Sequence, residues 1–152
     1  MPHTIYTETQ TQTLWRIASG FALGEILDEL AHRLQAASPG LRAAFLRVER
    51  AQPAHPPLLR LCCAPSMGDM YRDYMNGTGL VRGSSPIADV ALTGSPIYIQ
   101  NCETDTRLSP DTRAAYRRFG ASCYIAPLLE PRTAAVIGVV CLSPGHTNAP
   151  SP

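Results

Sequence analysis

The chain contains no lysine, and all 13 of its basic residues are arginines that are scattered along its 152 residues. Charged residues make up only 16% of the sequence, and the formal net charge is +1. Binding to nucleic acid or to an anionic membrane depends on clustered basic side chains, so neither kind of partner is expected. A charged fraction below the roughly 25% of typical soluble domains leaves room for a surface that contacts a protein partner.

Long hydrophobic runs and targeting signals are also missing. No apolar run approaches the roughly 20 residues that a membrane helix needs, and residues 1–13 lack both the basic start and the hydrophobic stretch of a signal peptide. We therefore expect a cytoplasmic protein. The length suits a single domain over residues 14–143, with a frayed segment 1–13 and a disordered tail over 144–152.

The sequence also lacks the motifs of a disulfide scaffold, a metal site or a hydrolase. Its five cysteines are odd in number and form no Cys-x-x-Cys pair, which fits a reducing compartment. The histidines lack zinc-ligand spacing, so neither a metal nor a cofactor is predicted. No Gly-x-Ser-x-Gly motif and no convincing pair of catalytic carboxylates is present, which indicates a protein that is not an enzyme. Each cysteine is expected to pack as a small buried hydrophobe.

An amphipathic helix is predicted over 23–37, where apolar residues recur at helical spacing before Pro39 and Gly40 end the pattern. A few helical turns over 11–19 precede it. The apolar stripe is expected to bury against a sheet, against a partner helix in a dimer, or against both. The predicted interface residues are Leu14, Trp15, Leu23, Leu27, Leu30 and Leu34.

Strands are predicted over 41–50, 58–64, 97–100, 121–128 and 133–142. The first two form a probable hairpin, and strict alternation would place Cys62 and Cys63 on opposite faces of the second strand. The segment 133–142 is the most apolar, so it is expected to be central in the sheet or covered on both faces.

Two helices in the segment 79–128 have clear start signals. Ser85 is a natural N-cap and Pro86 suits the first helical position, and the helix ends at Thr93 and Gly94. Ser109 followed by a proline repeats the same start for a helix over 111–119.

These elements and their anchors resemble a GAF domain over roughly residues 14–143. The anchors are Gly79, Thr93-Gly94-Ser95-Pro96-Ile97, Asp105-Thr106-Arg107, Phe119-Gly120-Ala121-Ser122, Ala126-Pro127-Leu128 and Ile137-Gly138-Val139-Val140. Residues 16–20, 25–28 and 64–67 are similar to the GAF domains of multidomain bacterial proteins in cyclic-di-GMP signalling, which carry synthase or phosphodiesterase modules.

The resemblance implies an α+β fold, in which a six-stranded antiparallel sheet has N-terminal helices on one face and pocket-forming helices and loops on the other. It implies a regulatory, small-molecule-sensing domain that passes ligand occupancy to an output domain absent from this chain. GAF domains usually continue into a long C-terminal helix, so we expect the chain to be a piece of a longer protein. The other readings are a ligand-free dimerisation module and a thiol redox sensor built on Cys102 and Cys123.

Catalytic and pigment-binding GAF domains differ from this chain at their reactive positions. Members that reduce methionine sulfoxide have cysteines where Ile87 and Tyr116 stand here. Members that bind a bilin attach it through a cysteine in the helix that corresponds to 111–119, which has none.

The predicted pocket is mostly apolar with a few polar groups, as small-molecule sites are. Its predicted residues are Tyr71, Tyr74, Met75, Ile87, Tyr98, Cys102, Arg107, Tyr116, Cys123 and Ile125. Arg107 could bind an anion through both guanidinium nitrogens, or it could pair with Asp105 or Glu103.

Overall fold

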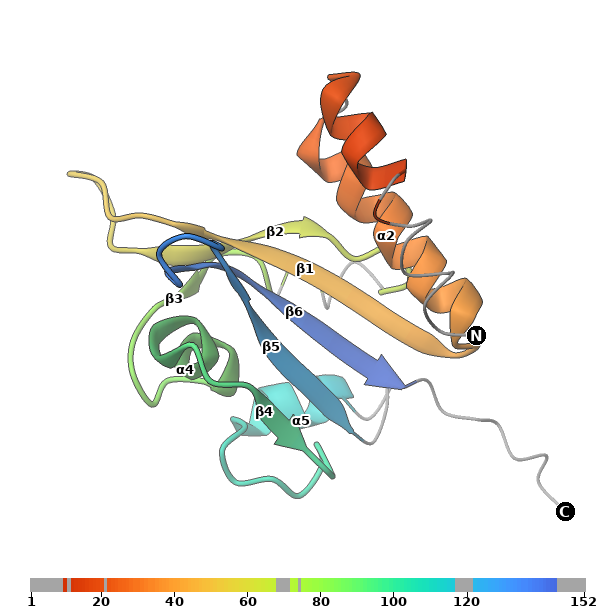
Figure 1. Cartoon of the computed structure of the whole chain (residues 1–152). Coiled ribbons are helices and arrows are strands. Elements are labelled where there is room, and N and C mark those ends of the chain that lie inside the picture. Colours follow the sequence, from red (N-terminus) through yellow and green to blue (C-terminus); the bar gives the residue numbers. More distant parts are fainter. Residues whose placement is uncertain are drawn as a thin grey trace, which may run out of the picture.

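The structure, a computed structural model, describes residues 10, 12–20, 22–67, 72–73, 75–116 and 122–144, except for the side chains of 115 and 116. It contains a six-stranded antiparallel sheet in the order β3-β2-β1-β6-β5-β4, with α2 on one face and α4 and α5 on the other (Figure 1). The strands are β1 (Leu41–Glu49), β2 (Leu58–Cys63), β3 (Thr78–Gly79), β4 (Ile97–Ile99), β5 (Cys123–Leu129) and β6 (Val136–Pro144). The helices are α2 (Leu23–Ala37), α4 (Pro86–Thr93) and α5 (Pro110–Tyr116), and residues 12–18 are also helical. The expected α+β architecture is confirmed.

The central strand of the sheet is β6, which pairs with β1 on one side and β5 on the other. This confirms the prediction drawn from its apolar sequence. The strand begins at Val136 rather than at residue 133, because Glu130 organises a tight turn before it. The Glu130 carboxylate accepts hydrogen bonds from the backbone N–H groups of Arg132 (3.1 Å) and Thr133 (2.6 Å).

The helix starts follow the sequence signals. At α4, the Ser85 hydroxyl accepts a hydrogen bond from the Ala88 N–H (3.2 Å), and Gly94 ends the helix with a left-handed backbone at φ 69°. At α2, the Glu25 carboxylate accepts from the Ala22 N–H (3.0 Å). None of the described helices is long and apolar enough to cross a membrane.

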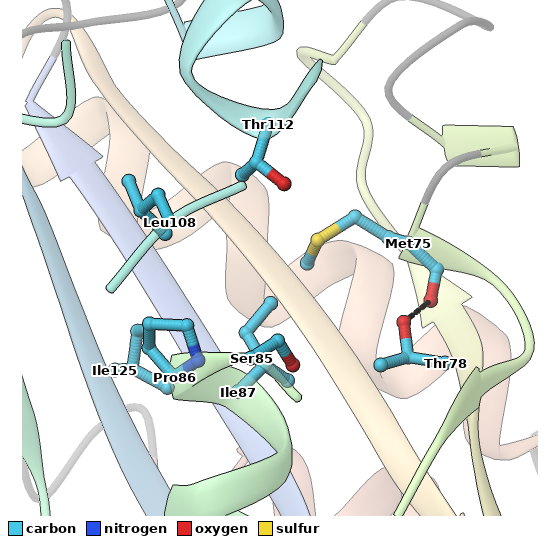
Figure 2. A pocket seen from close by; sticks show the side chains of 8 residues that line it. All are labelled: Met75, Thr78, Ser85, Pro86, Ile87, Leu108, Thr112 and Ile125. Carbon is cyan, nitrogen blue, oxygen red and sulfur yellow. Dashed lines mark hydrogen bonds between the residues drawn. The ribbon is translucent and has the colours of Figure 1, made fainter. Parts of the chain in front are cut away.

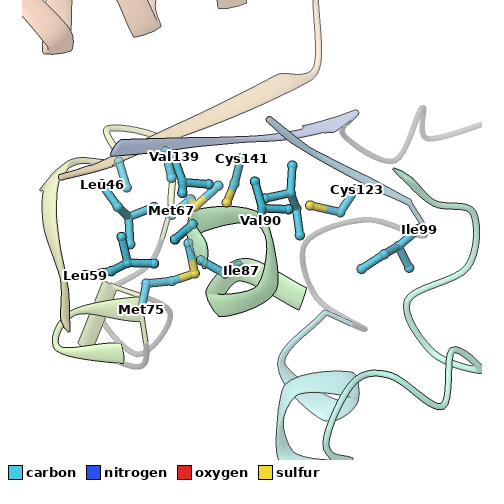
Figure 3. Close-up of a cluster of buried hydrophobic side chains, with 14 of the residues drawn as sticks. Leu46, Leu59, Met67, Met75, Ile87, Val90, Ile99, Cys123, Val139 and Cys141 are labelled. Atoms are coloured by element: carbon cyan, nitrogen blue, oxygen red, sulfur yellow. The ribbon is translucent and has the colours of Figure 1, made fainter. Parts of the chain in front are cut away.

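The sheet separates two hydrophobic cores. The helix-side core lies under α2 and consists of Ala31, Ala43, Phe45 and Cys63, with Leu27, Leu30, Cys62, Leu128, Val140 and Leu142 packed against it. The larger cavity-side core lies between the sheet and α4, where Figure 3 shows its side chains. Its members are Ala44, Leu46, Leu59, Ala64, Met67, Met75, Ile87, Val90, Ala91, Ile99, Cys102, Leu108, Cys123, Ile125, Val139 and Cys141.

Cys62 and Cys63 do not lie on opposite faces as predicted, since both contact the helix-side core. The reason is an irregularity in the pairing of β1 with β2, where Phe45 pairs with Cys63 and Leu46 pairs with Leu61. Cys62 is therefore the extra residue of a β-bulge, at which the alternation of side chains along the strand is interrupted.

The apolar stripe of the N-terminal helices divides between two roles. Ile26 and Ala31 are buried, and Leu27 and Leu30, which were predicted to form a dimer interface, pack on the sheet. The other predicted interface residues remain exposed; these are Leu14, Trp15, Leu23 and Leu34, together with Ile17. An ion pair between Arg16 and Glu29 joins the first helical segment to α2.

Candidate functional site

A small cavity lies on the face of the sheet opposite to α2, where the start of α4, the start of α5 and the segment around β3 meet β5 (Figure 2). Its lining residues are Met75, Thr78, Ser85, Pro86, Ile87, Leu108, Thr112 and Ile125. The cavity measures about 30 Å³, which is room for a single water molecule. Pockets that hold drug-sized ligands measure about 300–1,000 Å³, so this cavity as it stands is too small for such a ligand.

The start of α4 is held against the cavity by local hydrogen bonds. Ser85 caps the helix, and Pro86 and Ile87 follow it as buried residues. The Asp89 carboxylate accepts a hydrogen bond from the Gly83 N–H (2.7 Å), which fixes the preceding turn to the helix. Because α4 packs on β5 and β6, its first turn has a fixed position above the sheet.

The polar groups at the cavity are hydroxyls. Thr78 Oγ1 donates to the Met75 carbonyl (3.0 Å), and Ser85 Oγ accepts from the Ala88 N–H. Thr112 Oγ1 lies 2.8 Å from Ser109 Oγ, which also accepts from the Thr112 N–H. None of the eight described lining residues carries a charged side chain.

Three of the predicted pocket residues line this cavity, namely Met75, Ile87 and Ile125. Cys102 and Cys123 are fully buried in the cavity-side core but are not on the cavity wall. Tyr71 and Tyr74 lie outside the described residues, as does the side chain of Tyr116.

Tyr98 does not line this cavity, because it lies on the other face of the sheet; together with Arg107 it lines a separate, open pocket beside β4. In the pairing of β4 with β5, Ile97 opposes Ile125 and Tyr98 opposes Tyr124. Because side chains alternate along a strand, Tyr98 points away from the cavity, and it is 59% exposed. The sequence carries this signal, because Ile97 and Ile99 flank Tyr98 in the strand and therefore share the opposite face.

Arg107 pairs with Asp105, as one of its two predicted roles required. Its Nε lies 2.9 Å from Asp105 Oδ1, and its Nη2 donates to Asp105 Oδ2 and to the Tyr98 carbonyl (3.3 Å). The hydrogen bond from Arg107 lowers the pKa of the Asp105 carboxyl. Arg107 therefore fixes the loop 100–109, from which Cys102 and Leu108 enter the core, and its charge is compensated.

Five lining residues were not predicted; these are Thr78, Ser85, Pro86, Leu108 and Thr112. The available signal was the Ser-Pro pair that starts each helix, at Ser85-Pro86 and Ser109-Pro110. Both helices begin at the same cavity. The first residues of both helices lie on the cavity wall. The two Ser-Pro pairs therefore mark the segments that supply Ser85 and Thr112.

The buried thiols are poorly suited to redox or nucleophilic chemistry. Burial raises the pKa of Cys102 to about 12 and that of Cys63 to about 11, and a hydrogen bond with Cys123, together with burial, raises the pKa of Cys141. The reactive form of a cysteine is the thiolate, which these environments disfavour. Among the described residues, no group of three or more His, Cys, Asp or Glu side chains could hold a metal ion.

Neither protein-family models nor curated proteins match this sequence. Solved structures do match its fold. The A. aeolicus nlh2 GAF domain in an inactive state has 14% sequence identity and a TM-score of 0.63, over 93% of this chain and 80% of that chain. A GAF domain/HD domain protein from Geobacter sulfurreducens has 13% identity and a TM-score of 0.62, over 85% of this chain and 78% of that chain.

A third solved structure is the Staphylococcus aureus NreA protein, mutated in its nitrate binding site. It has 13% identity and a TM-score of 0.60, over 79% of this chain and 85% of that chain. At these identities the comparisons show a common fold, and this fold is that of GAF domains.

Proposed function

We propose that this chain is a regulatory sensory domain that binds a small molecule at the cavity and passes occupancy to an output domain of a bacterial signalling protein. The observation that carries the proposal is the convergence of two helix starts and β5 on an internal, uncharged cavity. The role that we propose is sensory and not catalytic. Its output in cyclic-di-GMP signalling is supported only by the sequence motifs at residues 16–20, 25–28 and 64–67.

Native mass spectrometry of freshly purified protein tests this proposal. A retained ligand is expected as an added mass, and ligand at a hundredfold excess over its Kd should stabilise the fold by about 2.7 kcal/mol in a thermal-shift experiment. Ile87→Phe should fill the cavity and abolish both effects. Ile137→Phe is the control, because Ile137 is exposed and lies away from the cavity wall. Retention that survives Ile87→Phe unchanged would contradict the proposed site.

A second candidate function is favoured by the small volume of the cavity. A domain whose cavity is permanently closed would act as an assembly module, which holds two copies together without binding a ligand. Such a module should show no added mass and no thermal response to any compound, whereas the sensor should show both.

We also propose a homodimer through the outer surface of the N-terminal helices. Leu14, Trp15, Ile17 and Leu23, which belong to the first helical segment and to α2, are all more than half exposed. Exposed large apolar residues that adjoin one another mark protein interaction sites. Leu27 and Leu30 pack on the sheet and are only partly buried, so they lie at the inner edge of the proposed interface.

Leu23→Glu is expected to weaken the dimer by roughly a hundredfold or more in Kd, because the twofold symmetry of a dimer removes two buried leucine side chains at once. Light scattering at matched concentrations measures this change. Leu129→Glu, at an exposed leucine at the end of β5, is the control and should leave the dimer intact. A wild-type protein that is monomeric throughout would rule out the dimer.

A further inference from the structure

The geometry points to an uncharged ligand with an aliphatic body and one oxygen atom that accepts a hydrogen bond from Ser85 Oγ. This inference rests on the proposed function, because it names the class of molecule that the same cavity binds.

The charge of the ligand follows from the cavity wall. Among the residues that the structure describes, all eight lining side chains are uncharged, and burying an ion without a partner has a large energetic cost. The starts of the two helices offer little compensation to an anion, because each first turn already carries its own carboxylate, Asp89 in α4 and Asp111 in α5. Arg107 is paired with Asp105 and is not on the wall. A neutral molecule is therefore the class that this wall accepts.

The position of the ligand's oxygen atom follows from the hydrogen bonds of the hydroxyl groups at the cavity. Thr78 uses its proton on the Met75 carbonyl, and Ser109 and Thr112 form a hydrogen bond with each other. Ser85 differs, because its oxygen accepts from the Ala88 N–H and, within the described part of the chain, no protein group accepts its proton. Its side chain is partly exposed, so water can accept this proton until a ligand takes its place. A ligand oxygen at the cavity would supply that acceptor.

Room for the ligand can come from Met75. Its side chain is fully buried, and Figure 2 shows it extending between Thr112 and the start of α4. Methionine is unbranched and has three rotatable bonds, so it can change rotamer where a branched side chain would be fixed. A change of the Met75 rotamer would enlarge the water-sized space without moving the sheet. Met75 is thus the residue expected to set the length of the aliphatic body.

The test is an NMR titration of the wild-type chain, observed at the methyl groups of Met75, Ile87 and Ile125. The probes are two matched series, the straight-chain primary alcohols from propanol to octanol and the carboxylates of the same chain lengths. The alcohols should shift these methyl resonances, with Kd falling about fourfold for each added methylene until the cavity is full. The matching carboxylates should bind at least about a hundredfold more weakly.

Two variants sharpen the test. Ser85→Asp keeps an N-cap but places a carboxylate at the cavity, so alcohol binding should be lost; Ser95→Asp, at an exposed serine, should bind as wild type does. Met75→Ala should move the best-binding alcohol to a longer chain.

Three results would overturn the inference. Carboxylates that bind as tightly as the alcohols at the same methyl groups would refute the neutral class but leave the sensory pocket intact. Unchanged alcohol binding in Ser85→Asp would refute the role of Ser85. The absence of shifts from both series would refute the aliphatic class, while a ligand retained in native mass spectrometry would still support the proposed function.

Discussion

Gly138→Ala is expected to lower the free energy of unfolding by about 3 kcal/mol. A Cβ atom at this position would lie well inside van der Waals contact with the carbonyl oxygen of Leu46, and it would also crowd the Leu128 side chain. The obstacle is backbone, so no rotamer change can relieve it. Gly138 belongs to β6, which is held between β1 and β5, and a shift of any of these strands would break ladder hydrogen bonds.

Urea denaturation of Gly138→Ala and the wild type measures this effect as a lower midpoint. Gly24→Ala is the matched control, because the same substitution in α2 meets no atom within 4 Å. Alanine is also the better helix former, so this variant should be as stable as the wild type or slightly more stable. Equal midpoints for Gly138→Ala and the wild type would mean that β1 and β6 are farther apart than the structure shows.

Cys102, Cys123 and Cys141 are expected to react with a thiol-specific alkylating reagent at least about a thousandfold more slowly than Cys62, because their labelling requires opening of the core. All three are fully buried in the cavity-side core, whereas Cys62 is only partly buried at the bulge of β2. Mass spectrometry with peptide mapping measures the rate at which each cysteine is alkylated. In denaturant all five cysteines should label at similar rates.

The raised pKa values also predict a loss of stability in alkali. A thiol whose pKa is higher in the folded state than in the unfolded state stabilises the fold fully below the unfolded value, near 9. That stability falls as the pH rises toward the pKa of Cys102, about 12. Rapid labelling of Cys102 or Cys123 in the native protein would contradict both expectations and support the redox sensor.

The sequence predicted the elements well wherever a local signal was strong. The helix over 23–37 was placed with the bounds of α2, because its apolar period and Pro39 are both local features. The apolar run of β6 also predicted its central place. The sixth strand of the sheet was implied only by the resemblance. It is β3, whose two residues, Thr78 and Gly79, are too few to show a period.

The site was less predictable, because it depends on contacts between distant segments. Ile87 and Ile125 were predicted with the help of the family resemblance, which indicated the pocket face of the sheet, but Thr112 reaches the cavity only because α5 begins above it. The bulge at Cys62 has a similar origin, since it is defined by the pairing with β1 and not by the sequence of β2. Tyr98 was also placed by the resemblance, and the pairing of β4 with β5 puts it on the face away from this cavity.

A single hydrogen bond joins α2, on one face of the sheet, to a segment that enters the core on the other face. Gln35, near the end of α2, donates to the hydroxyl of Ser66, and the next residue, Met67, is buried in the cavity-side core. The core that contains Met67 also contains the cavity residues Met75, Ile87 and Ile125. The end of α2 is therefore tied, through Ser66, to a segment that packs in the same core as the cavity wall.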